Sequence, residues 1–180
     1  AFTALSCYGY FLNATERDLL ATLVFAYIFL TILYQISISG EVKELEAERE
    51  KNLLRSLGAK IENGILNLGL GKYYAIMLKG IQICVLVLIL KIVGIGYLRF
   101  FIVSLFIGFI IIILHEQTIK RKWNRNIELR NMSLMEIATI FCLCIAILGR
   151  LEVITLLSFS ICYFCIMNKV LWKTTLHPAV

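Results

Sequence analysis

Residues 98–114, LRFFIVSLFIGFIIIIL, contain a single charged side chain, Arg99, close to their beginning. A helix that crosses a bilayer needs about 20 mostly apolar residues. Four further apolar stretches lie on either side of this one, at 19–38, 73–97, 133–149 and 151–171. The chain has 180 residues, 60% of them hydrophobic, and a mean hydropathy of +0.85. These features predict an all-α, polytopic transmembrane helical bundle that forms one domain over residues 1–180.

The apolar stretches set the expected number of spans at five, or six if residues 1–12 also cross the bilayer. Residues 1–12, AFTALSCYGYFL, are apolar but short, and the first residue is Ala rather than Met. We expect this segment to be either the remnant of a longer helix or an interfacial segment. The lipid bilayer is therefore the first partner that the sequence predicts.

Two charged segments separate the apolar stretches, at 40–72 and 115–130. Residues 115–130 form a basic loop, with five lysines and arginines against two glutamates. Cytoplasmic loops of membrane proteins are enriched in lysine and arginine, so we expect this loop in the cytoplasm. Counting spans in both directions places 40–72 and the C-terminal segment, with Lys169 and Lys173, on the same side.

Lys79 and Lys91 interrupt the apolar stretch 73–97. A lysine inside a membrane-spanning helix is a candidate functional residue, because burying its charge in lipid is costly. The alternative is that the long side chain extends to the bilayer surface, where the ammonium group stays hydrated. Each lysine is within reach of one surface, so we favour this alternative for both.

The segment GEVKELEAER, residues 40–49, lies directly after an apolar stretch and contains four glutamates, of which three have helical spacing. Glu41, Glu44 and Glu48 are separated by steps of three and four. A helix turns about 100° per residue, which gathers the three side chains within a sector of about 60°. Because like charges at this spacing repel, cations, water or a metal ion must offset the repulsion. Mg²⁺ binds carboxylate and phosphate oxygens together, so this face predicts a Mg²⁺–diphosphate site.

The nearby residues include cations that suit phosphate oxygens. Among them, the candidate substrate contacts are Lys43, Arg49, Arg55 and Lys60. The alternative is a charge-balanced helix on the membrane surface that binds no ligand, since residues 41–72 contain six acidic and six basic side chains.

The stretch GEVKELEAEREKNLLRSL resembles the first acidic motif of the UbiA-type intramembrane prenyltransferases. The acidic positions of that motif fall on Glu41, Glu44 and Glu48 without a gap, although the family has Asp at each. Arg49 and Arg55 fall on its basic positions and Asn52 on its asparagine, so the resemblance adds Asn52 to the candidate substrate contacts. The resemblance implies that the glutamates bind Mg²⁺ and the arginines the diphosphate of an isoprenoid. With five or six spans and no second acidic motif, it implies part of an enzyme or an inactive relative.

Residues 49–60, REKNLLRSLGAK, also resemble the coupling segment of FtsX-type ABC permeases. That resemblance implies an amphipathic helix, closed by a C-cap glycine, that binds an ATPase subunit. The partner-binding residues would be Glu50, Leu54, Arg55, Leu57 and Gly58. It requires no metal ion.

A third interpretation is a non-catalytic helical subunit that contacts other membrane subunits of a larger complex. Nucleic acid is not an expected partner, because the basic residues lie where anionic lipid headgroups are already at hand.

Overall fold

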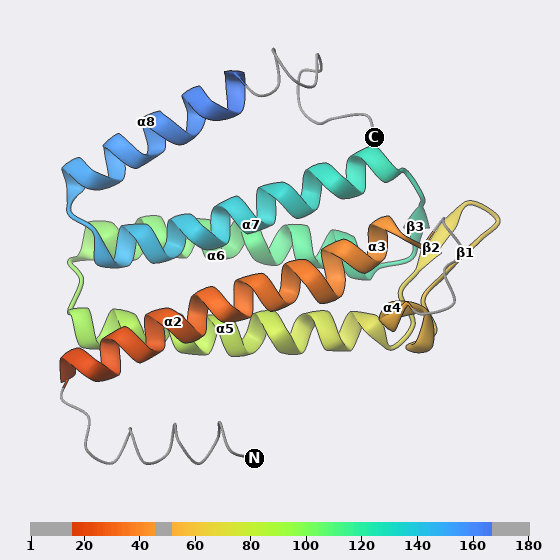
Figure 1. Ribbon diagram of the computed structural model, residues 1–180, viewed down its shortest axis with the longest axis horizontal. Helices are drawn as coiled ribbons and strands as arrows, with labels where there is room; N and C mark the ends of the chain where they lie inside the picture. The colour runs from red at the N-terminus through yellow and green to blue at the C-terminus, as the bar shows by residue number, and fades with distance from the viewer. Residues whose placement is uncertain (1–15, 46–51, 167–180) are drawn as a thin grey trace.

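The structure is a computed structural model that describes residues 16–45 and 52–166 (Figure 1). Helices dominate it. The N-terminal half contains α2 (Glu16–Tyr34), the π-helix η1 (Gln35–Gly40), α3 (Glu41–Lys43), α4 (Leu53–Ser56), β1 (Lys60–Glu62), β2 (Ile65–Asn67) and α5 (Gly71–Val93). The C-terminal half contains α6 (Tyr97–Thr118), β3 (Arg121–Lys122), α7 (Arg125–Ile147) and α8 (Arg150–Ile166).

Four helical segments are long and apolar enough to cross a membrane: Asp18–Gly40, Gly71–Val93, Tyr97–Thr118 and Arg125–Ile147. They lie side by side in a bundle, in which α2 packs on α5 and α6 packs on α7 (Figure 1). Contacts of α7 with α5 and α2 join the two pairs. The outward faces carry large exposed apolar side chains, such as Phe25, Leu105 and Ile112, as expected where lipid covers a helix.

The expected count of five or six spans is not confirmed by the described residues. The fifth apolar stretch forms α8, which has 17 residues and a shorter apolar run, Ile154–Tyr163. It extends away from the four long helices (Figure 1). Residues 1–12 lie outside the part of the chain that the structure describes.

One end of the bundle carries α3, α4 and a three-stranded antiparallel sheet of order β1-β2-β3, and we call it the sheet end (Figure 1). The sequence interpretation was purely helical and did not predict this sheet. The two-residue turn Asn63–Gly64 joins β1 to β2, and both residues have positive φ, as a type I′ hairpin turn requires. β3 then pairs with β2, so the two charged segments of the sequence meet here.

The basic loop is shorter than the predicted 115–130. Helix α6 extends to Thr118, and α7 already begins at Arg125. The side chain of Asn124 caps α7 by accepting hydrogen bonds from the backbone N–H groups of Asn126 and Ile127. Only the intervening residues, with β3, form the connection.

Candidate functional site

Helix α2 continues through η1 into α3 with helical backbone angles, and this continuity places the acidic residues. Glu41 begins α3 and Glu44 is its C-cap, so the two side chains share a helix face at the sheet end. Both are half-buried. π-Helical segments such as η1 occur often at functional sites. Glu48 and Arg49 lie outside the described residues, as does the side chain of Lys43.

Two of the predicted substrate contacts, Asn52 and Arg55, fold back onto this acidic turn. The Asn52 side chain donates to the Glu41 carbonyl oxygen at 2.9 Å. The Arg55 guanidinium donates to the Leu45 carbonyl oxygen at 2.8 Å. One Glu41 carboxylate oxygen accepts from the Leu53 backbone N–H at 2.9 Å. The structure therefore brings the Asn52 amide and the Arg55 guanidinium onto the backbone of the turn that contains Glu41 and Glu44.

Lys60 does not join this group. It lies on β1, where its ammonium group contacts the Glu62 carboxylate at 2.6 Å and both side chains are exposed. Among the described residues, no group of three or more His, Cys, Asp or Glu side chains is placed to hold a metal ion. Mg²⁺ is commonly held by one or two carboxylates, with water and phosphate oxygens completing its shell. Glu41 and Glu44 are the two carboxylates that the described part of the acidic turn provides.

In the segment predicted to bind an ATPase subunit, the described helix is shorter than expected and one of the predicted contact residues is buried. Of the expected helix over 49–60, the described part contains only the single turn α4. Leu54 is completely buried inside the chain, so its side chain is not available to a partner in this conformation. Gly58 follows the turn with φ +84°, as a C-cap glycine does.

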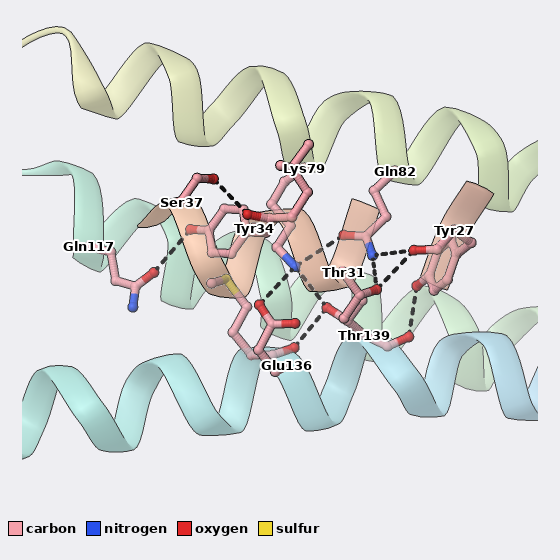
Figure 2. Close-up of polar contacts among 11 residues, drawn as sticks. Tyr27, Thr31, Tyr34, Ser37, Lys79, Gln82, Gln117, Glu136 and Thr139 are labelled. Carbon is pink, nitrogen blue, oxygen red and sulfur yellow. Dashed lines mark hydrogen bonds and ion pairs between the residues drawn. The ribbon is translucent and has the colours of Figure 1, made fainter. Parts of the chain in front are cut away.

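A second candidate site lies inside the bundle, where Lys79 of α5 is only 1% exposed (Figure 2). Its ammonium group donates to Gln82 Oε1 at 3.0 Å, Thr139 Oγ1 at 3.2 Å and Glu136 Oε1 at 3.4 Å. A lysine has three N–H donors, so each has an acceptor. The expectation that Lys79 extends to the bilayer surface is therefore wrong.

Helix α2 also contributes to this group of buried polar contacts around Lys79, which we call the interior cluster. The Tyr34 ring lies 4.3 Å from Lys79 Nζ, a cation–π distance. Gln82 Nε2 donates to Thr31 Oγ1, and the Tyr27 hydroxyl donates to the Thr139 carbonyl oxygen at 2.7 Å. The cluster consequently ties α2, α5 and α7 together (Figure 2).

Two further polar contacts lie between the interior and the sheet end. The Tyr34 hydroxyl donates to Gln117 Oε1 of α6 at 3.4 Å. Nearer the sheet, Arg121 of β3 forms an ion pair with the buried Glu128 of α7 and lies 3.9 Å from Glu116.

The sequence interpretation did not single out Glu136, although the signal was present. Glu136 is an acid within an apolar helix, and its side chain is 12% exposed. At a rise of 1.5 Å per residue it lies about 16 Å into α7, and Lys79 lies about 12 Å into α5. Both helices start from the sheet end, so the two opposite charges lie at similar depths and can pair. Pairing costs less free energy than exposing either charge to lipid.

Comparisons with known proteins give no match: no protein-family model, curated protein or solved structure is significantly similar to the chain. The functional argument therefore depends on the two sites themselves.

Proposed function

We propose that the chain is a divergent UbiA-like membrane prenyltransferase, or part of one, that binds an isoprenoid diphosphate through Mg²⁺ at the sheet end. The observation that carries the proposal is the folding of Asn52 and Arg55 onto the turn that contains Glu41 and Glu44. This turn ends a helix long enough to span the bilayer, where a diphosphate headgroup would lie while its isoprenoid tail enters the apolar region.

Each residue has a distinct role in this proposal. Glu41 and Glu44 hold Mg²⁺, and a carboxylate that accepts one backbone N–H still has a second oxygen for the metal. Arg55 contacts the diphosphate, because a guanidinium matches phosphate oxygens in a bidentate manner. Asn52 positions Arg55 by capping α4, since its side chain accepts from the Arg55 N–H at 3.0 Å. Mg²⁺, when bound, supplies positive charge that stabilises the departing diphosphate.

The test is equilibrium binding of geranylgeranyl diphosphate to the detergent-solubilised chain, with Mg²⁺ and with a chelator. Binding should require Mg²⁺, and Glu44→Gln and Glu48→Gln should each weaken it by about tenfold, or about 1.4 kcal/mol. Glu116→Gln is the matched control, because Glu116 is exposed at the same end but lies on α6. Equal binding by all variants, or binding indifferent to the chelator, would rule out the proposal.

A second candidate is a non-catalytic helical subunit of a larger membrane complex. The interior cluster favours it, because two of the three Lys79 donors join α5 to α7, through Glu136 and Thr139. Stable, folded protein without diphosphate binding is the outcome that this second function predicts.

A further inference from the structure

A small cavity of about 10 Å³ lies behind the acidic turn, between η1, β2, α6 and α7. Most of its lining is apolar, including Ile38, Val42 and Met132, but Gln117 and Glu128 also line it. A cavity of this volume holds about one water molecule. Whether such a cavity is wet depends on the polar atoms that face it.

Two buried polar atoms at this cavity have no hydrogen-bond partner among the described residues: Gln117 Nε2 and Glu128 Oε2. Gln117 is 3% exposed and Glu128 is 2% exposed. The other side-chain polar atom of each residue already has a partner, since Gln117 Oε1 accepts a hydrogen bond from Tyr34 and Glu128 Oε1 pairs with Arg121. Buried polar atoms in folded proteins nearly always have a partner, and ordered water supplies many of them.

The two unpaired atoms are complementary, because the amide nitrogen is a donor and the carboxylate oxygen is an acceptor. We infer that one water molecule occupies this cavity, accepting a hydrogen bond from Gln117 Nε2 and donating one to Glu128 Oε2. Tyr34 and Thr118, which each carry a hydroxyl group, also line the cavity. Two to four polar partners are usual for a buried water.

The water completes a polar seam, defined as Arg121, Glu128, the water, Gln117 and Tyr34. This seam runs from β3 at the sheet end to the ring that lies against Lys79. It joins α2, α6 and α7 by polar contacts at a depth where the rest of the packing is apolar. Val42, next to Glu41, lines the same cavity.

Hydroxyl-radical footprinting by X-ray radiolysis tests the inference, because radiolysis of a bound water oxidises a methionine beside it. Met132 lines the cavity, whereas Met135 lies three residues further along α7 and does not. Both are buried, with 3% and 0% exposure, so bulk solvent reaches neither. In the folded chain, Met132 should become oxidised several-fold faster than Met135.

Gln117→Leu keeps the side chain's approximate size but removes the donor, and should lower Met132 oxidation to the Met135 rate. Gln35→Leu is the matched control, because Gln35 is exposed on η1, and it should leave the ratio unchanged. Equal, slow oxidation of the two methionines in the unmodified chain would show a dry cavity and overturn the inference. Persistent fast oxidation of Met132 in folded Gln117→Leu protein would overturn it as well.

Discussion

Lys79 lies inside an apolar bundle with an acceptor for every N–H of its ammonium group. Its nearest charge is Glu136, whose second carboxylate oxygen, Oε2, is buried without a hydrogen-bond partner among the described residues. Removing one member of a buried ion pair leaves the other charge uncompensated in a medium of low dielectric constant. Replacing both with apolar side chains removes that problem, so the single and double substitutions should differ sharply.

Lys79→Met should lower the free energy of unfolding by about 3–5 kcal/mol, because Glu136 would keep a buried charge without its cation. Lys79→Met combined with Glu136→Met should recover most of that loss, since neither charge would remain. The measurement is unfolding of the purified chain in mixed micelles as the denaturing detergent is increased.

Lys91→Met is the control for this pair of variants, because Lys91 lies on the same helix but is exposed. It should leave the unfolding transition almost unchanged. A double variant as unstable as the sum of its two single variants would show that Lys79 and Glu136 are not coupled.

At the scale of elements, the sheet end depends on close backbone contact between the two residues after α4 and Gly69, the second residue after β2. Gly69 has φ +55°, and a Cβ at this position would lie 2.7 Å from the carbonyl oxygens of Leu57 and Gly58. The Leu70 backbone N–H donates to the Leu57 carbonyl oxygen at 2.8 Å, and this hydrogen bond fixes the segment that leads into α5. No side chain fits between these backbones without moving them.

Gly69→Ala should therefore destabilise the chain by about 1–3 kcal/mol, through both the strained φ and the contact with backbone oxygens. Gly80→Ala is the matched control, because Gly80 lies within α5 and an added Cβ meets no atom within 4 Å. Alanine is the better helix former, so this control should be neutral or stabilising by up to about 1 kcal/mol. Thermal unfolding of the two variants side by side makes the comparison, and equal transitions would contradict it.

The long helices were predictable from the sequence, because an apolar run long enough to cross a bilayer is a local signal. The hairpin also has a local signal, the Asn63–Gly64 turn, which the charge pattern of residues 40–72 obscured. The acid within the apolar helix α7 was a signal for Glu136, but it names no partner by itself. The pairing of β3 with β2 has no local signal, because it depends on how distant helices align along the bundle.

At the scale of the whole molecule, the acidic turn, the proposed polar seam and the interior cluster follow one another from the sheet end into the bundle. The acidic turn lies at that end (Figure 1), and the proposed seam from Arg121 to Tyr34 leads from it toward the interior cluster. The far end, where α5 meets α6, carries Tyr97 with 97% of its surface exposed. A diphosphate substrate made in the cytosol could reach Glu41 and Glu44 only if the sheet end faces the cytosol.

The most direct test of this arrangement is labelling with a membrane-impermeant maleimide in intact cells. The chain, with its native cysteines replaced by serine, would carry either Lys122→Cys on β3 or Tyr97→Cys at the far end. Tyr97→Cys should be labelled from outside, whereas Lys122→Cys should be labelled only after the membrane is permeabilised. Labelling of Lys122→Cys in intact cells, or of both positions equally, would contradict a membrane-spanning bundle whose sheet end faces the cytosol.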